Sequence, residues 1–393
     1  MKIALVCEFP FIHPQKGVEL RLHQTAELLS EIGTVWPVII TRFETPSARL
    51  DDLREKFGSV SYIIPTEEPD TSMKSKLLRL IARKKVADRG YHVSADARAD
   101  LIKQLQACDV VWFHSLKVAD SLGTYRWTNG ILDFDDLHSK KYLQAAKLDH
   151  QLKVKIKGRW LALCWRQWEL DALQRFQRVV VCSEEDRKFM GSQEQIEVIQ
   201  NIFARQGPIE NPRDPSGDRV GFIGTLEYAA NRDAVRWFVD TVLPLLVKLN
   251  PSIQFRIAGK IPAGMAPIDH PNVNLLGFVD NLADEMATWS ASVAPLRVGS
   301  GTRLKILESF SRRCPVVSTT VGCYGLKVEN RVDLLIGDSA EQFALACNEL
   351  CNSPALGAQL SASACLKWQQ NYTLEAVRPV VRRLASITTE PDQ

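Results

Sequence analysis

The first half of the chain alternates short apolar runs, rich in β-branched residues, with longer stretches of helical character. Runs without polar alternation predict strands that are buried on both faces. Such strands separated by helices predict a parallel α/β sheet. Because these sheets bind ligands beyond the carboxyl ends of their strands, the residues after each run are the first candidates for a site. The predicted strands span residues 3–7, 38–41, 60–64, 110–114, 131–134 and 179–182.

A second series of apolar runs follows a stretch without periodicity. Residues 203–218 hold three prolines and two glycines and are predicted to be a linker. We therefore expect two Rossmann-like domains, residues 1–202 and 219–371, that face a central cleft. The apolar runs of the second domain span residues 220–223, 255–258, 273–276, 292–294, 316–318 and 334–336.

The chain ends in a predicted helix over residues 374–386, after a break at residues 371–373. Pro379 should kink this helix or mark its start, because proline lacks the N–H group that a helix interior needs.

Length and composition agree with a globular protein of two domains. A chain of 393 residues is too long for one ordinary core, and its 45% hydrophobic and 24% charged residues are typical of globular proteins. Residues 1–7 resemble the start of a signal peptide, but Glu8 ends the apolar run. The sequence holds no apolar run of about 18 residues, so no spanning helix is predicted. We expect a cytoplasmic protein.

Charge and cysteine usage argue against two further classes of protein. A formal net charge of +3 is small, and no recognition motif indicates nucleic-acid binding. The nine cysteines are scattered without a CxxC pair, which predicts reduced core thiols and no zinc site.

Residues 291–320 carry the most informative pattern, a strand, a glycine loop, a helix and a second strand. Gly299 and Gly301 allow a ligand to approach the backbone. Thr302 can cap the helix, and Pro315 ends it before the next buried strand. A glycine loop that opens a helix presents unpaired N–H groups and the positive end of the helix dipole, which suits a diphosphate.

Charged residues in this segment extend the same chemistry. Arg297, Arg303 and Lys305 add positive charge where a leaving nucleotide diphosphate develops negative charge. Glu308 lies one turn beyond Lys305, and its carboxylate can accept hydrogen bonds from both ribose hydroxyls. In the alternative interpretation, Lys305 and Glu308 form an exposed ion pair and the glycines only make a turn. The segment lacks the glycine and lysine spacing of a P-loop.

The run 295–308, followed by residues 314–319, resembles the donor-site signature of the retaining glycosyltransferase family 4. The resemblance covers most of residues 219–372. It implies a GT-B fold, a C-terminal helix (372–393) that crosses back to the N-terminal domain, and a UDP- or GDP-linked sugar as donor, with no cofactor and no metal. The implied transfer retains the anomeric configuration, and the donor phosphate helps to deprotonate the acceptor. Further matching blocks, in the family's order, are residues 221–226, 231–238, 257–259 and 276–280.

The resemblance also implies roles for single residues. Glu308 would hold the nucleotide ribose, and Gly224 and Thr225 would lie against the donor. Arg303 and Lys305 would act on the diphosphate as catalytic residues. The rest of the implied donor site is Arg297, Gly299, Ser300, Gly301, Thr302 and Leu304.

The sequence departs from the broader family at several of these positions. Ser300 replaces the first glutamate of the EX7E pair, Thr225 and Asn231 replace a common arginine and lysine, and Tyr324 replaces a frequent later glutamate. The leading interpretation is transfer to a saccharide, lipid-linked or small-molecule acceptor. Two alternatives stay open: a nucleotide-sugar 2-epimerase on the same fold, and a catalytically silent donor-binding subunit.

In the first domain, two segments resemble parts of the family's site. Gly17 and Arg21 follow the first strand in residues 16–21, which resemble the loop over the donor phosphate; the alternative is a plain surface turn. His114 ends the fourth predicted strand, where the family places a residue that contacts the sugar, so we assign it as catalytic. The alternative is a structural histidine.

An acidic DxD triplet at residues 133–135 resembles the metal-binding motif of the other major glycosyltransferase fold. Because the second half indicates GT-B, we interpret Asp135, Asp136 and His138 as acceptor-side residues and not as metal ligands. The alternative is a helix cap formed with Ser139.

Residues 74–89 and 153–168 are basic and amphipathic. Relatives that glycosylate lipid carriers rest on anionic membranes through such helices, so one interpretation is a peripheral contact at the inner face of the cell membrane. The alternative is a solvated helix that packs Trp160, Trp165 and Trp168 inward.

Overall fold

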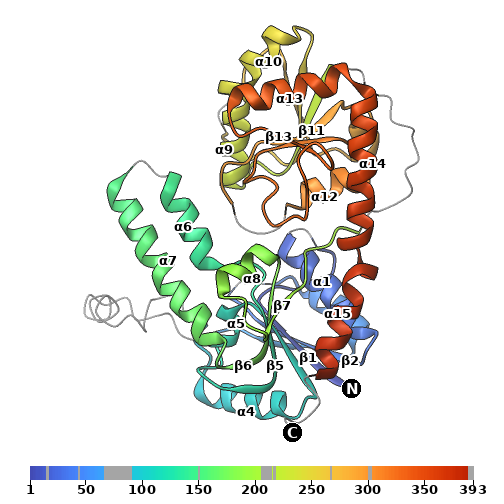
Figure 1. Cartoon of the computed structure of the whole chain (residues 1–393). Helices are drawn as coiled ribbons and strands as arrows, with labels where there is room; N and C mark the ends of the chain where they lie inside the picture. Colours follow the sequence, from blue (N-terminus) through green and yellow to red (C-terminus); the bar gives the residue numbers. More distant parts are fainter. Residues whose placement is uncertain are drawn as a thin grey trace. The chain divides into compact units, whose positions relative to one another are not determined.

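The computed structural model describes residues 1–14, 17–42, 45–65, 91–148, 151–204, 215, 218–265, 268–299 and 303–387. The chain divides into two compact units: unit 1 comprises Met1–Gln200 and Val377–Gln393, and unit 2 comprises Asn201–Ala376 (Figure 1). Each unit is built on a sheet whose neighbouring strands are parallel. The prediction of two Rossmann-like α/β units is confirmed.

Unit 1 holds a seven-stranded sheet in the order β3-β2-β1-β4-β5-β6-β7. The central runs are buried on both faces, as the apolar pattern predicted. The sequence pattern missed β7, because its three residues include a glutamate between Ile and Val. The strands are β1 (Lys2–Cys7), β2 (Thr34–Ile40), β3 (Ser61–Ile63), β4 (Val110–His114), β5 (Trp127–Asp133), β6 (Phe176–Val181) and β7 (Ile196–Val198).

Helices cover this sheet around an aromatic core. The Phe113 ring lies 4.8 Å from that of Trp127 and 5.5 Å from that of Phe176, measured between centroids, and aromatic pairs at this spacing stabilise a core beyond their buried area. The helices are α1 (Gly17–Ser30), α2 (Ser47–Phe57), α4 (Ala95–Gln106), α5 (Leu116–Asp120), α6 (His138–Leu148), α7 (Leu152–Ala172), α8 (Glu184–Met190) and α15 (Leu374–Ile387).

The last helix, α15, groups with unit 1 from Val377 onward. Arg378 and Arg382 both pair with Glu31, at 2.9 and 3.0 Å, and Arg383 pairs with Glu197 at 2.7 Å. The return of the C-terminal helix to the first domain is therefore confirmed. Pro379 lies inside the helix and does not mark its start.

Helices α6 and α7 form a hairpin that projects from unit 1 (Figure 1). Its helices approach closely at Gly158, where an added Cβ would lie only 2.8 Å from that of Ala146. Trp165 and Trp168 are buried in the core and Trp160 packs against it, as the inward alternative predicted. The other basic stretch, residues 74–89, lies outside the described residues.

Unit 2 holds a six-stranded sheet in the order β10-β9-β8-β11-β12-β13. Phe238 packs against Phe255 and Phe343, with ring centroids 4.2 and 6.0 Å apart. Its elements are β8 (Arg219–Ile223), α9 (Ala229–Trp237), the π-helical turn η1 (Phe238–Val242), α10 (Leu243–Leu249), β9 (Gln254–Ala258), β10 (Val273–Gly277), α11 (Leu282–Ala287), β11 (Ala291–Ala294), α12 (Leu304–Ser311), β12 (Val316–Ser318), β13 (Leu335–Ile336), α13 (Ala340–Asn352) and α14 (Pro354–Asn371).

Both sheets reverse their winding direction once. In unit 1 the chain runs outward from β1 to β3 and then returns to β4 on the other side of β1; in unit 2, β8 and β11 are related in the same way. Ligands of open α/β sheets bind at such switch points, beyond the carboxyl ends of the strands. The fold therefore directs attention to the residues after β1 and β4, and after β8 and β11.

Most of the predicted linker, residues 203–218, lies outside the described residues. Its first residue is paired within unit 2: the Phe203 N–H donates to the Tyr372 carbonyl at 3.0 Å, and its carbonyl accepts from Trp368 Nε1 at 3.0 Å. All nine cysteines are buried free thiols. Over the part of the chain that the structure describes, no helix is both long and apolar enough to cross a membrane.

Candidate functional site

The turn after β8 requires glycine. Gly224 has φ +150°, and a Cβ there would lie 2.8 Å from Asn231 Nδ2 and 3.1 Å from Lys305 Nζ. Gly259, which follows β9, lies so close that its Cβ would stand 2.3 Å from the Gly224 carbonyl oxygen. Two backbone turns and two polar side chains thus converge at the switch point of unit 2.

Lys305 comes to this turn from α12. Its Nζ donates to Asn231 Oδ1 at 2.9 Å and lies 3.7 Å from the centroid of the Phe222 ring. Burial, and then the charge of Arg303, hold the pKa of Lys305 well below its usual value. The alternative prediction of an exposed Lys305–Glu308 pair is wrong, because the lysine turns inward to Asn231. A partly desolvated ammonium with a neutral partner is ready to receive an anion.

Asn231 and Thr225 form the next links of the same network. Asn231 Nδ2 donates to the Thr225 carbonyl at 2.8 Å. Thr225 Oγ1 donates to the Lys260 carbonyl at 3.3 Å and accepts from the Glu227 N–H at 3.2 Å. Asn231 was noted in the sequence only as a departure from the family pattern. The structure shows that it joins the glycine turn to Lys305.

Arg303 lies against the second glycine turn. A Cβ on Gly299, which has φ +126°, would stand 2.9 Å from Arg303 Nη2 and 3.1 Å from Nη1. Arg303 is the N-cap residue of α12, and Leu304, the first residue of that helix, packs on the core. The predicted donor-site residues Ser300, Gly301 and Thr302 lie outside the described residues.

Arg297 is exposed and already paired. Its Nη2 and Nε donate to Asp233 Oδ1 and Oδ2 at 2.6 and 3.2 Å, and its guanidinium carbon lies 5.8 Å from the centroid of the Trp237 ring. Asp233 therefore neutralises part of the positive charge that the sequence analysis assigned to donor binding. The donor-binding role of Arg297 stays a prediction.

Glu308 lies on α12, one turn before its ion-pair partner. Its Oε1 accepts from Arg312 Nη2 at 3.2 Å and from Nε at 3.3 Å. Burial raises the pKa of Glu308, and Arg312 opposes that shift. No hydrogen bond reaches Oε2 from the described residues, so that oxygen is available to a ligand.

In unit 1, Arg21 and Asp133 form a buried pair. Arg21 Nη2 and Nε donate to Asp133 Oδ1 and Oδ2 at 2.8 and 3.0 Å, and Nη1 donates to the Ile199 carbonyl at 3.1 Å. Burial disfavours the charged form of both side chains. The opposite charge and the hydrogen bonds of the partner outweigh burial in each case, so the pKa of Arg21 is raised and that of Asp133 is lowered. Arg21 thus has a structural role in this state. Its predicted role at the donor phosphate, and that of the helix-starting Gly17, stay predictions.

His114 is the neighbour of Asp133 in the sheet. Burial is the main cause that lowers its pKa to about 4, so the ring is neutral at pH 7. Its side chain is 2% exposed, and Nε2 has no hydrogen-bond partner among the described residues. A buried ring nitrogen without a partner costs free energy, and a ligand hydroxyl would satisfy it.

The acceptor-side candidates follow β5. Asp135 has φ +56° and lies with its Oδ1 3.8 Å from Arg21 Nε, and Asp136 follows it. His138 stacks on Trp165 with ring centroids 4.2 Å apart; burial, then Lys141 and Lys117, lower its pKa to about 4. The Ser139 N–H and hydroxyl both donate to Glu169, so Ser139 is tied to α7 and does not make the alternative cap.

Sequence reasoning missed a second polar group in unit 1. Tyr91 donates its hydroxyl to Glu8 and accepts from Lys117 Nζ at 3.1 Å, while the Arg42 guanidinium carbon lies 5.1 Å from the centroid of the Tyr91 ring. Glu8 and Arg42 follow predicted strands, so the strand-end rule that selected His114 could have found them. Tyr91 and Lys117 carried no such signal.

Comparison with known sequences adds a family description for part of unit 2. Residues 217–353 match the family model described as glycosyl transferases group 1. A curated relative, an uncharacterized 44.6 kDa protein in the cps region of Klebsiella pneumoniae, is 27% identical over 135 residues. That match spans 32% of this chain and 35% of the relative, or about a third of the relative's length.

Solved structures match over nearly the whole chain. Anabaena HepE in complex with UDP and glucose has 14% identity and a TM-score of 0.64, over 98% of this chain and 100% of that one. S. aureus TarM, as a variant in complex with fondaparinux, alpha-GlcNAc-glycerol and UDP, has 12% identity and a TM-score of 0.61, over 98% and 99%. A glycosyltransferase from Rickettsia africae has 12% identity and a TM-score of 0.64, over 100% and 99%. The fold is that of the GT-B glycosyltransferases, and the group 1 match together with these neighbours supports a GT-B glycosyltransferase.

Proposed function

We propose that this protein transfers a sugar from a nucleotide diphosphate to an acceptor hydroxyl, with retention of the anomeric configuration. The observation that carries the proposal is the convergence of Lys305 and Arg303 on two glycine turns, at Gly224 and Gly299. The turns follow β8 and β11, on either side of the switch point of unit 2. This is also the segment that matches glycosyl transferases group 1.

The chemistry of these groups suits a leaving diphosphate. Breaking the sugar–phosphate bond leaves its electron pair on the diphosphate, where negative charge develops. Fixed cations in a water-poor site stabilise that charge without reorganising, and removing one such donor costs about 10² to 10³ in kcat. The interaction with the diphosphate should be strongest at Lys305, because a nearby anion stabilises the charged ammonium form that burial disfavours. In the proposed transfer the donor phosphate accepts the proton of the acceptor hydroxyl on the same face.

Glu308 and His114 complete the proposed roles. Glu308 accepts hydrogen bonds from the two ribose hydroxyls. Its Oε2 is available, and its Oε1 also accepts from Arg312. His114, neutral at pH 7, hydrogen-bonds a hydroxyl through Nε2. The proposal requires no metal or cofactor, and both oxygens of Asp133, in the DxD triplet, accept from Arg21.

The comparisons favour a uridine nucleotide and a glycan product. HepE and TarM were both seen with UDP, so we propose a UDP-linked sugar as the first donor to test. The position of the Klebsiella relative in a cps region favours a saccharide or lipid-linked acceptor in glycan biosynthesis.

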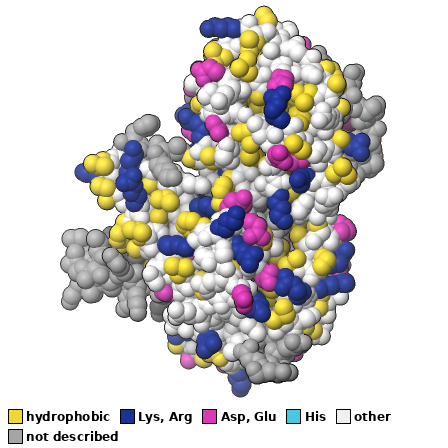
Figure 2. All heavy atoms as spheres, viewed as in Figure 1, with side chains coloured by type: hydrophobic (Ala, Val, Ile, Leu, Met, Phe, Trp, Pro, Cys, Tyr) yellow, Lys and Arg dark blue, Asp and Glu magenta, His cyan; other side chains and the backbone are white. Residues whose placement is uncertain are grey.

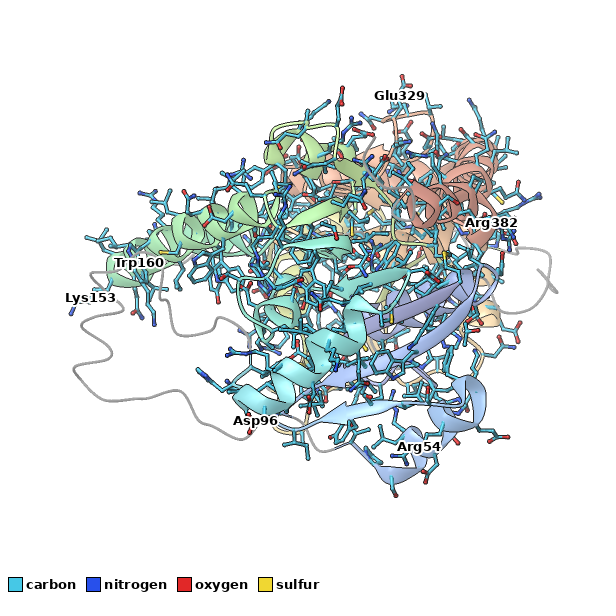
Figure 3. The ribbon with its side chains drawn as sticks, turned by 90° about the horizontal axis from the view of Figure 1, so that it is seen from below. Arg54, Asp96, Lys153, Trp160, Glu329 and Arg382 are labelled. Carbon is cyan, nitrogen blue, oxygen red and sulfur yellow. The ribbon has the colours of Figure 1, made fainter. Side chains whose placement is uncertain are left out.

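We also propose that the α6–α7 hairpin contacts an anionic membrane surface. Leu152, Ile156 and Leu163 are 70%, 59% and 71% exposed, and helical spacing places them on one side of α7. The helix holds no Asp or Glu before Glu169 and carries five basic residues ahead of it: Lys153, Lys155, Lys157, Arg159 and Arg166. Lys153 lies at the outer end of the projection in Figure 3. Figure 2 shows hydrophobic and basic side chains together on this projection. Exposed aliphatic groups among cations are typical of interfacial helices.

A panel of nucleotide sugars tests the donor site. The right donor should raise the melting temperature, because a ligand at about 100 times its Kd adds roughly 2.7 kcal/mol to stability. Lys305→Met should lose most of that gain. Arg331→Gln, which removes an exposed cation paired with Glu349, is the matched control and should keep it. Equal stabilisation of all three proteins, or of none, would contradict the proposed site.

The two alternative functions differ from transfer in their products. A 2-epimerase would release an intact nucleotide sugar with a changed sugar, whereas a silent subunit would bind the donor and leave it unchanged. Product analysis by ¹H NMR separates all three.

For the membrane contact, Ile156→Ser with Leu163→Ser should reduce binding to phosphatidylglycerol vesicles, and binding should weaken with salt. Undiminished binding by this variant would refute the role of α7.

A further inference from the structure

The polar group missed by the sequence lies at the carboxyl edge of the unit 1 sheet. Glu8 directly follows β1, Arg42 comes two residues after β2, and Lys117 lies on α5 directly after β4. Tyr91 supplies the ring between them. The switch point of this sheet falls between β1 and β4, and ligands of open α/β sheets bind at that point. We call Glu8, Arg42, Tyr91 and Lys117 the tyrosine cluster.

A buried tyrosine ring holds two cations in place. Tyr91 is 3% exposed. Lys117 Nζ lies 4.5 Å from the ring centroid and the Arg42 guanidinium carbon 5.1 Å from it, both within the range of cation–π attraction. The Tyr91 N–H is fixed in turn by Ser121 Oγ at 2.7 Å. The two positive groups are therefore preorganised and do not need to be ordered by a ligand.

The charges of the tyrosine cluster do not balance. Glu8 is the carboxylate at the cluster, 3.5 Å from Lys117 Nζ and only 14% exposed. Arg42 is exposed, and within the described parts of the chain it makes no hydrogen bond or ion pair. Among the residues that the structure describes at the cluster, two cations thus stand against one carboxylate, and the guanidinium has its five N–H donors available.

A second observation at the same sheet edge also indicates a ligand. His114 ends β4, three residues before Lys117, and its buried Nε2 has no partner among the described residues. Val6 of β1 pairs with Phe113 of β4, so Glu8 and His114 follow neighbouring strands at the same edge of the sheet. A molecule that carries both a hydroxyl and an anionic group would satisfy the histidine and the arginine together.

We propose that Arg42 and Lys117 bind an anionic group of the acceptor, a carboxylate or a phosphate, at the tyrosine cluster. This inference rests on the proposed function, because it names the acceptor class for that transfer. Guanidinium groups match both anions with paired hydrogen bonds, and Lys117 adds a point charge. Glu8 competes for Lys117 and so limits the affinity. Because the two cations outnumber this carboxylate, the site selects an acidic saccharide or a sugar phosphate over a neutral sugar.

Three small probes test the site without turnover. Methyl β-D-glucuronide carries a carboxylate, glucose 6-phosphate carries a phosphate, and methyl β-D-glucoside is the neutral match. Their affinities are measured by ligand-observed NMR titration at constant ionic strength, because salt screens such contacts. At least one anionic probe should bind the wild type about tenfold more tightly than the neutral probe, the scale of one charge-assisted hydrogen bond. The anionic probe that binds more tightly identifies whether the anionic group of the acceptor is a carboxylate or a phosphate.

Variants assign the binding to the tyrosine cluster. Arg42→Gln with Lys117→Gln should remove the preference for the anion, whereas Glu8→Gln should strengthen it. Arg54→Gln, an exposed arginine on α2 that pairs with Asp51, is the matched control and should change neither (Figure 3). Equal affinities for charged and neutral probes, or a preference that survives in the double variant, would overturn the proposal.

UDP binding in the same samples separates this inference from the proposed function. UDP should bind the wild type and the double variant equally well, because Arg42 and Lys117 belong to unit 1, whereas the proposed nucleotide contacts of Lys305, Arg303 and Glu308 belong to unit 2. If UDP binds and the anion preference is absent, the acceptor inference fails alone. If the anion preference is present and no nucleotide sugar binds, the proposed function fails and an anion site remains.

Discussion

Glu308→Gln removes the charge of the carboxylate assigned to the nucleotide ribose. In the structure its Oε1 accepts from Arg312 at 3.2 and 3.3 Å, and no described residue donates to Oε2. A carboxylate can accept from both hydroxyls of a ribose, whereas the amide keeps one acceptor oxygen and loses the charge. Hydrogen bonds to charged groups contribute about 1.5 to 3 kcal/mol, so UDP affinity should fall about 10- to 150-fold.

Isothermal titration with UDP and with 2′,3′-dideoxy-UDP measures this effect. The loss should be large for UDP and small for the dideoxy nucleotide, which has no diol to lose. Because burial raises the pKa of Glu308, the preference of the wild type for the diol should fade as pH falls through that raised value. Arg312→Gln, which keeps the carboxylate, is the control and should keep the preference. If Glu308→Gln binds both nucleotides as the wild type does, Glu308 is only a helix-surface partner of Arg312.

Three further predictions follow from buried charges. Asp133→Asn should lower the free energy of unfolding by about 3 to 5 kcal/mol in urea denaturation, because it leaves the Arg21 guanidinium buried without its counter-charge; full stability in this variant would contradict the pairing. Burial raises the pKa of Glu169 from 4.5 to about 7, so the folded state binds more protons between these values and stability should fall as pH rises from 4.5 to 7, by up to about 3 kcal/mol. Glu169→Gln should flatten that dependence, and an unchanged slope would refute it. A bound diphosphate should raise the lowered pKa of Lys305, so UDP binding should take up protons in the pH window between the two values. Calorimetry in buffers of different ionisation heat should show this uptake, and Lys305→Met should abolish it.

Strand positions were largely predictable because buried parallel strands have a simple signature. The run 110–114 became β4 and the run 316–318 became β12 without change. The starts of β2 and β5 were missed, since Pro37 and the polar Thr128 and Asn129 interrupt those runs. Short β7, with its central glutamate, gave no apolar run at all. Pattern therefore predicted the core of each strand better than its edge.

The candidate site was predictable only in part, because partners distant in sequence decide what each side chain does. The glycines and Lys305 were found from their local pattern, but the choice of Asn231 over Glu308 as the partner of Lys305 depends on how α12 meets the turn after β8. Arg21 and Asp133 are 112 positions apart, and nothing local indicated their pairing. Tyr91 likewise meets Glu8 only in the folded unit.

The central claim is that this chain breaks the bond between a sugar and a nucleotide diphosphate. The most direct test follows UDP-glucose, UDP-N-acetylglucosamine and GDP-mannose by ¹H NMR during incubation with the wild-type protein and with Lys305→Met. We predict that the anomeric signal of one donor decays in the wild type, and that the sugar first appears with the donor's anomeric configuration. Decay should be about 10² to 10³ slower in the variant. Intact donors throughout, or decay at the same rate in both proteins, would contradict the account.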